Sequence, residues 1–214
     1  MKSVIFFFGA LFCSILVAHA QDFNGGIVAG MSTSQIDGDA FLGYNKAGLV
    51  FGGFVNRELK EKLTAEFGII YIGKGSKEPE NPDSSECSFC KITLRYIEVP
   101  VLLQFKRLKV REKELKLILE AGLSFGVLFS YKEEDEHGDI ELIEFYKSTE
   151  LGFIAGLSYP LSETISFNSR FEYSILPIAN QIMFNAKTWR ISGGSFNRLF
   201  SFTLKYQFKV HPVE

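Results

Sequence analysis

The sequence predicts an all-β fold, an eight-stranded antiparallel up-and-down transmembrane β-barrel. Three observations predict it: an export signal at the N-terminus, eight segments in which large apolar residues alternate with polar ones, and connections that alternate between short and long. A period of two residues is that of a β-strand. After the first 20 residues, no stretch approaches the roughly 20 uninterrupted apolar residues that a membrane helix needs. If the mature chain enters a membrane, it therefore does so as strands.

The N-terminus has the pattern of a cleaved signal peptide. Lys2 precedes an apolar run over residues 4–17, and Ala18-His19-Ala20 follows as a small-x-small cleavage pattern. We expect residues 1–20 to be a signal peptide that is removed after Ala20. Export out of the cytoplasm is the first consequence.

We expect residues 21–214 to form a single β-barrel domain, because no linker rich in Pro, Gly or Ser divides them. Removal of the signal leaves 22 basic and 25 acidic residues, a formal net charge of −3. This balance lacks the basic footprint of a nucleic-acid-binding protein. We therefore expect no nucleic-acid partner.

Eight segments have strand character. In chain order they are Phe23–Ser32, Asn45–Asn56, Leu63–Lys74, Ile92–Lys106, Leu115–Tyr131, Ser148–Tyr159, Thr164–Ser174 and Leu199–Val210. The last shows the alternation most clearly, with Phe200, Phe202, Leu204, Tyr206 and Phe208 on one face and Ser201, Thr203, Lys205 and Gln207 on the other.

The connections between these segments alternate in length. The short ones are Arg57–Lys62, Arg107–Glu114 and Pro160–Glu163, and the long ones are Thr33–Tyr44, Gly75–Lys91, Lys132–Lys147 and Ile175–Arg198. Short turns at one end and long loops at the other are typical of bacterial outer-membrane barrels with both termini in the periplasm.

Residue size decides which face points inward. In the fifth strand Leu117, Leu119, Ala121, Leu123, Phe125, Val127 and Phe129 share one face, and Glu120, Gly122, Ser124, Gly126 and Ser130 share the other. An eight-stranded interior is narrow and accepts mainly small side chains. We therefore assign the polar, glycine-bearing face to the lumen and the apolar face to lipid. The alternative is a soluble lipocalin-like barrel with an apolar interior.

The inward-facing charges form the first group of candidate site residues: Glu66, Glu120, Arg170, Glu172 and Lys205. Buried ionisable groups persist when they are paired and hydrogen-bonded, so we expect a lumen salt-bridge network, with a proton or ion path as the alternative. Arg95 and Glu98 have opposite parity in the fourth strand, and Pro100 cannot donate to the ladder. We infer a bulge near Pro100.

Two further groups lie in the long connections. Cys87 and Cys90 form a lone Cys-x-x-Cys, for which we expect a local disulfide in an oxidising envelope and no metal, because two further zinc ligands are missing from the loop. The last long loop carries Phe184, Trp189 and Arg190, residue types that are common in binding hot spots. We consider this loop a candidate recognition loop, with a plug over the barrel mouth or a membrane anchor as alternatives.

Several short motifs give the chain a family resemblance. They are Gly26–Ser34 with Gly38-Asp39, Gly43–Lys46 with Gly48, Tyr71 with Lys74-Gly75, Tyr96–Pro100, Phe171–Ser174 and Tyr206–Phe208. In their order and spacing the mature chain resembles the PorT-like, porin-family outer-membrane β-barrel proteins of Gram-negative bacteria. The resemblance implies location and architecture more than activity, and a few members of the family are linked to protein secretion.

We therefore expect a non-enzymatic outer-membrane barrel with a structural, assembly, secretion-associated or binding role and no cofactor. Its expected partners are membrane lipid, lipopolysaccharide and other envelope or secretion proteins. A membrane-embedded enzyme is a weaker alternative, since the mature chain has only His137 and His211, too far apart to share a site. A soluble periplasmic carrier of an apolar ligand is the other. The ligand and the oligomeric state cannot be derived from the sequence.

Overall fold

The computed structural model describes residues 23–39, 43–78, 91–106, 108–110, 113–135, 138–140, 146–179 and 194–208. Its strands are β1 Phe23–Asp37, β2 Lys46–Lys60, β3 Leu63–Lys77, β4 Lys91–Phe105, β5 Leu108–Val110, β6 Lys113–Leu115, β7 Ile118–Asp135, β8 Gly138–Ile140, β9 Thr149–Pro160, β10 Ile165–Ser174 and β11 Phe196–Gln207. The described residues contain no helix that is long and apolar enough to cross a membrane.

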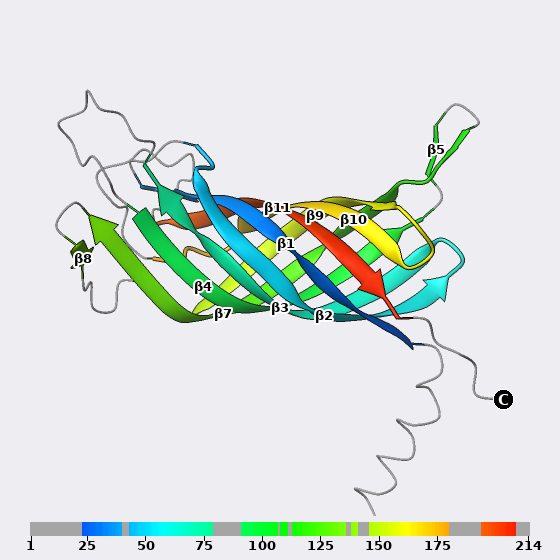
Figure 1. Ribbon diagram of the computed structural model, residues 1–214, viewed down its shortest axis with the longest axis horizontal. Helices are drawn as coiled ribbons and strands as arrows, with labels where there is room; N and C mark the ends of the chain where they lie inside the picture. The colour runs from blue at the N-terminus through cyan, green and yellow to red at the C-terminus, as the bar shows by residue number, and fades with distance from the viewer. Residues whose placement is uncertain are drawn as a thin grey trace, which may run out of the picture.

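Eight of these strands form a closed antiparallel barrel. The order around the sheet is β4-β3-β2-β1-β11-β10-β9-β7, and β7 pairs with β4 to close the ring. Each barrel strand pairs with the barrel strands before and after it in the chain, and β1 pairs with β11. Figure 1 shows the strands tilted around a common axis, with the short strand β8 at the left end and the hairpin that contains β5 at the right end. The predicted eight-stranded up-and-down barrel is confirmed.

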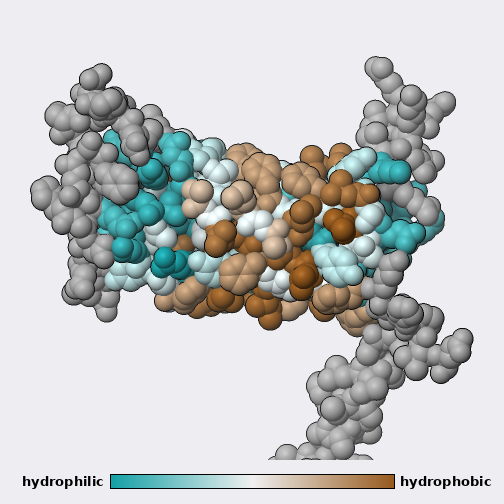
Figure 2. All heavy atoms as spheres, viewed as in Figure 1, coloured by the Kyte–Doolittle hydropathy of each residue, from teal (hydrophilic) through white to brown (hydrophobic). Residues whose placement is uncertain are grey.

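The two faces of the barrel differ in polarity as predicted. Along β7, Leu119, Leu123 and Phe125 are exposed on the outside, whereas Glu120 and Ser124 are buried inside. On the face seen in Figure 2, apolar residues form a band over the middle of the barrel, and hydrophilic residues gather at its two ends, most of all at the left. A belt of this kind matches the hydrocarbon layer of a bilayer.

The strands extend past the predicted limits at the loop end. β1 continues to Asp37 and β3 to Lys77, beyond the limits set by the apolar alternation. The alternation stops where the apolar belt stops, but backbone pairing continues, for example between Ser34 and Lys46. At the other end, the predicted turn Arg107–Glu114 contains the small hairpin of β5 and β6.

The predicted bulge near Pro100 is wrong in its position. Pro100 pairs with Ser124 in an unbroken register. The register shift lies between Arg95, which pairs with Ser130, and Tyr96, which pairs with Leu128, so that the extra residue belongs to β7. Ser130, which the sequence placed on the inner face, consequently lies beside Arg95, whose Nη1 donates to its Oγ at 3.0 Å.

Close approach between strands explains one of the inward-facing glycines. A Cβ atom on Gly30 of β1 would lie 2.1 Å from the carbonyl oxygen of Phe202 in β11. No real Cβ approaches an oxygen so closely, so β1 and β11 pack this tightly only with glycine at this position. Gly53, on the outer face of β2, meets nothing nearer than 3.6 Å.

Candidate functional site

Four charged side chains meet inside the barrel near the short turns. We call Glu66, Glu120, Arg170 and Lys205, from β3, β7, β10 and β11, the turn-end cluster. Lys205 Nζ lies 2.5 Å from Glu66 Oε1, Arg170 Nη2 lies 3.0 Å from the same oxygen, and Arg170 Nε lies 2.6 Å from Glu120 Oε2. The two carboxylates and the two cations give the turn-end cluster a formal net charge of zero. Arg170 joins the two carboxylates into one network.

Amide side chains complete the turn-end cluster. Gln104 Nε2 donates to Glu66 Oε2 at 2.7 Å and to Glu120 Oε1 at 2.9 Å. Asn168 Nδ2 donates to the same Glu120 oxygen at 3.0 Å. All four charged groups are buried. The network therefore satisfies the condition under which ions remain stable away from water, namely pairing together with additional hydrogen bonds.

A second group of charges lies nearer the loops. We call Lys74, Glu98, Glu150 and Glu172 the loop-end cluster; the four residues come from β3, β4, β9 and β10. Lys74 Nζ lies 2.5 Å from Glu98, 2.8 Å from Glu172 and 3.1 Å from Glu150. Lys74 and Glu98 are fully buried. One ammonium thus cross-links three carboxyl groups on three other strands.

Neutral donors hold two of these carboxyl groups in place. Ser124 Oγ donates to Glu172 at 2.7 Å, and Ser174 Oγ donates to Glu150 at 2.6 Å. Asn197 Nδ2 donates to the second oxygen of Glu150 at 2.9 Å. Within the described residues, Lys74 is the one ion-pair partner of the Glu98 carboxyl group. The position of Glu98 therefore depends on Lys74.

A small cavity lies between the two clusters. It is lined by the apolar side chains Val28, Val50, Ile70, Ile72 and Ile154, and by the polar residues Arg170, Glu172, Ser201 and Thr203 of β10 and β11. The cavity enclosed here measures only about 20 Å³, about enough for a single water molecule. The described part of the lumen therefore contains no wide aqueous channel.

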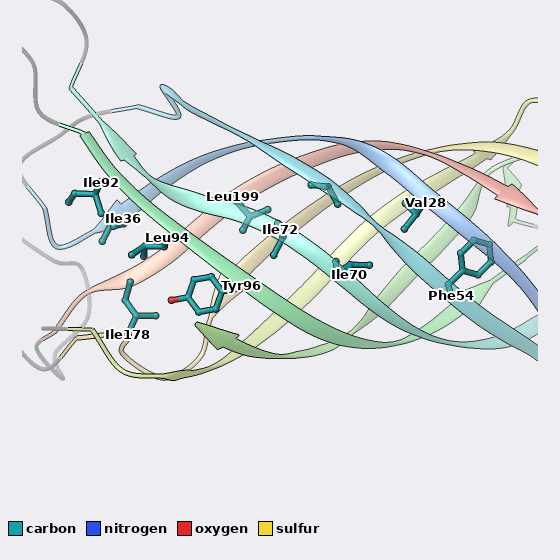
Figure 3. Close-up of a cluster of buried hydrophobic side chains, with 11 residues drawn as sticks. Val28, Ile36, Phe54, Ile70, Ile72, Ile92, Leu94, Tyr96, Ile178 and Leu199 are labelled. Carbon is teal, nitrogen blue, oxygen red and sulfur yellow. The ribbon is translucent and has the colours of Figure 1, made fainter. Parts of the chain in front are cut away.

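The loop end of the lumen is closed by a second apolar group. Figure 3 shows Ile36, Ile92, Leu94, Tyr96 and Ile178 clustered at this end. Ile178 follows β10 and is fully buried; its backbone N–H donates to Ser195 O at 2.8 Å. The described start of the β10–β11 connection therefore covers the mouth of the barrel.

Tyr146, in the connection before β9, contacts the same mouth of the barrel. Tyr146 Oη donates to Glu133 Oε1 at 2.6 Å, and the Tyr146 ring lies 5.9 Å from that of Tyr131. Burial, followed by this hydrogen bond, raises the pKa of Tyr146 above its ordinary value. The hydroxyl therefore remains a donor throughout the physiological range.

The turn end, in contrast, is open. A cavity of about 260 Å³ leads inward from the short turns to the turn-end cluster, and Asn56, Gln104 and Gln207 are among its lining residues. Asn56 Nδ2 donates to Gln207 Oε1 across it at 3.2 Å. The polar character of this cavity suits water better than an apolar ligand.

The sequence-predicted site residues divide into three sets. Glu66, Glu120, Arg170 and Lys205 come together, but Glu172 lies in the other cluster with Lys74. Sequence reasoning missed Lys74 and Glu150 as members of a network, although both have inward parity. Cys87, Cys90, Phe184, Trp189 and Arg190 lie outside the described residues, as do the signal peptide and its cleavage site.

Among the described residues, no three His, Cys, Asp or Glu side chains are placed so that they could hold a metal ion. The carboxyl groups of the two clusters are instead occupied by Lys, Arg, Gln, Asn and Ser donors. The ion pairs and hydrogen bonds of the two clusters join strands across the lumen.

Comparison with known proteins identifies a family and several structures of the same kind. Residues 20–180 match the family model described as outer membrane protein beta-barrel domain. Ail, the attachment invasion locus protein of Yersinia pestis, is 14% identical with a TM-score of 0.48, covering 87% of this chain and 99% of that chain. Neisserial surface protein A is also 14% identical with a TM-score of 0.47, covering 87% and 97%. OprG from Pseudomonas aeruginosa is 13% identical with a TM-score of 0.44, covering 87% and 97%. No curated protein matches the chain.

Proposed function

The chain belongs to the outer membrane protein β-barrel domain family, and from this premise we propose that it is a non-enzymatic barrel that presents binding loops at the bacterial surface. Within the family we propose the PorT-like, porin-family subtype, on the motifs Tyr96–Pro100 and Phe171–Ser174. Export by a signal peptide that is cleaved after Ala20 is part of the same proposal.

One observation carries this proposal: the barrel is apolar outside and ionic inside. Exposed side chains such as Ile69, Phe125 and Leu204 surround the barrel on different strands. In water they would form an apolar patch far larger than soluble monomers tolerate. In lipid the same face is solvated, and closure of the sheet leaves no unpaired strand edge.

The interior argues against transport and against the carrier alternative. Ion pairs cross the lumen at two levels, and the cavity between them measures only about 20 Å³. A carrier of apolar ligands needs an apolar cavity of some 300 Å³ or more. We therefore propose that the barrel is a rigid membrane support and that its loops perform the binding.

The lumen also argues against the enzyme alternative. Catalysis requires a nucleophile and a base that a substrate can reach. The carboxyl groups of the turn-end cluster are held by Arg170, Lys205 and Gln104, and those of the loop-end cluster are held by Lys74. These contacts serve to join strands. We propose that the described part of the chain has no catalytic role.

We propose the β10–β11 connection as the principal recognition loop, on the sequence character of Phe184, Trp189 and Arg190. Its described start, around Ile178, is anchored in the barrel mouth, which fixes where the loop leaves the barrel. A local Cys87–Cys90 disulfide would restrain the β3–β4 connection. The proposed partners are membrane lipid, lipopolysaccharide and other envelope or secretion proteins.

Fractionation of the native envelope tests the proposal. We expect the full chain in the outer-membrane fraction and, after detergent extraction, a gel mobility that changes on boiling, because a closed barrel resists the detergent until it is heated. Trypsin added to intact cells should cleave after Lys187 or Arg190. A soluble periplasmic protein without the mobility shift would contradict the proposal and favour the carrier.

A further inference from the structure

A groove on the outer surface of the barrel lies where the apolar belt ends near the loops. It is bordered by β1, β2, β3 and β4, which are neighbours in the sheet (Figure 1), and its volume is about 260 Å³. Met31, Leu49 and Tyr71 form its apolar side. Lys46, Thr93 and Arg95 line its other side. We call this feature the rim groove.

Gly73 creates the space for the rim groove. In the strand register Met31 pairs with Leu49, and Gly73 pairs with Arg95 on the other side. Met31 and Leu49 are more than half exposed on the outer face. Because Gly73 has no side chain, the outer surface is hollowed between Leu49 and Arg95. A Cβ at this position would lie 3.2 Å from Gly48 Cα.

The rim groove lies at the level of the lipid headgroups. The Tyr71 ring stacks on that of Phe51, with 4.7 Å between the ring centroids, and its centroid lies 6.0 Å from that of Phe129. Aromatic rings of this kind mark the membrane interface. Lys46 and Arg95 lie toward the loops from these rings. A lipid at this position would have its acyl chains against the apolar side and its headgroup beside the two cations.

Among the described residues at the rim groove, cations exceed anions. Lys46 Nζ donates to Ala47 O at 2.9 Å and makes no ion pair with any described residue. Arg95 donates to Ser130 and likewise lacks a carboxylate partner in the described part of the chain. Lys91 and Arg95 are close enough to Lys46 to repel its charge.

Glu134, the described carboxylate that attracts Lys46, already has partners. Glu134 lies 2.8 Å from both Lys91 Nζ and Lys132 Nζ. Its single charge is therefore shared between two lysines, and its attraction for Lys46 is smaller than the repulsion of Lys46 by Lys91 and by Arg95. Lys46 is only 7% exposed, so its charge is costly unless a further anion approaches it.

From this charge excess, and on the premise that the barrel lies in the outer membrane as proposed, we propose that the rim groove binds a phosphorylated lipid of the outer leaflet, of the lipopolysaccharide type. The lipid phosphate would lie between Lys46 and Arg95, since guanidinium and ammonium groups are the common protein partners of phosphate. One acyl chain would cover Met31, Leu49 and Tyr71. The site is a local one on the β2–β4 side, distinct from general solvation by the membrane.

The test uses the purified full chain in neutral detergent micelles, with deep-rough lipopolysaccharide as the probe and its dephosphorylated form as the matched control ligand. We expect the combined Lys46→Gln and Arg95→Gln variant to bind the phosphorylated lipid at least 10-fold more weakly than the wild type. Raised salt should weaken the wild-type binding as well. Lys106→Gln, which removes an exposed charge at the other end of the barrel, should bind as the wild type does.

Gly73→Val tests the shape of the groove without changing its charge. It should also weaken binding at least 10-fold, and the heat-dependent mobility shift shows whether each variant is folded. Equal binding of the dephosphorylated lipid, unchanged binding by the folded charge variant, or displacement of the lipid by inorganic phosphate at equal concentration would overturn the inference. Because binding is measured on purified protein, it can fail while the envelope fractionation still succeeds, and the reverse also holds.

Discussion

The turn-end cluster predicts a specific response to the loss of Lys205. Replacement by Met keeps the length of the side chain and removes its charge. Glu66 would then keep Arg170 and Gln104 as partners, but it would lose the ammonium that lies 2.5 Å from both of its oxygens. The cluster would change from two cations and two carboxylates to an uncompensated negative charge inside the barrel.

Removal of one partner of a buried ion pair costs about 3–5 kcal/mol. With a denaturant slope of about 1–3 kcal/mol per molar urea, this cost lowers the unfolding midpoint by at least about 1 M. The double variant Lys205→Met with Glu66→Gln restores the formal balance, because Glu120 keeps Arg170 at 2.6 Å. We therefore expect the double variant to regain at least half of the stability lost in the single variant.

The assay is urea unfolding of the barrel from lipid vesicles, followed by the mobility shift on gels. Lys106→Met is the matched control, because its ion pair with Glu58 is long, at 3.5 Å, and exposed. Such pairs contribute about 0–1 kcal/mol. If Lys205→Met unfolds at the same urea concentration as the control, or if the double variant is less stable than Lys205→Met, the reasoning about charge balance is refuted.

Three further predictions concern the belt, the strand packing and the loop end. Leu123→Arg in the outer belt should cost about 2–4 kcal/mol in vesicle unfolding, whereas Leu161→Arg in an exposed turn should change little; equal effects would contradict the assigned membrane position. Gly30→Ala should lower the free energy of unfolding by about 1–3 kcal/mol through overpacking, whereas Gly53→Ala should not. A Gly30→Ala barrel as stable as the wild type would disprove the close approach of β1 and β11. Because the pKa of Tyr146 is raised, its contribution to stability is fully present below the ordinary tyrosine pKa of about 10 and is lost as pH rises above it. Ultraviolet titration should show no loss of tyrosinate absorbance at pH 11 in Tyr146→Phe, and a loss there would refute the shift.

The faces of the strands could be predicted because the pleat fixes them. A period of two residues assigns Leu123 and Glu120 to opposite sides of β7 without knowledge of any neighbour. The depth of Glu66 and Arg170 could also be estimated, since each lies a few residues from a short turn. The position of the bulge could not be predicted, because the extra residue lies in β7. The bulge had been inferred from the irregular segment of β4, which lies opposite.

The turn-end cluster was predicted, but the composition of the loop-end cluster could not be, because it depends on the stagger of the barrel. Neighbouring strands are displaced along the axis by an amount that no single strand records. Lys74 is far in the sequence from the short turn that precedes β3, yet its ammonium group reaches Glu98, Glu150 and Glu172 on three other strands. The rim groove was missed for a similar reason, since Lys46 and Arg95 belong to segments that become neighbours only through the register of β2, β3 and β4.

The pairing of β1 with β11 determines when the molecule can finish folding. Gly26 pairs with Gln207, so the first and last strands form a common seam. Until β11 has paired with it, β1 has an open edge, and open edges promote aggregation in water. Contacts between residues so distant in the chain also slow folding. The barrel can therefore close only after β11 has reached β1, and until then the open edge of β1 is where we expect the chain to be most prone to aggregate.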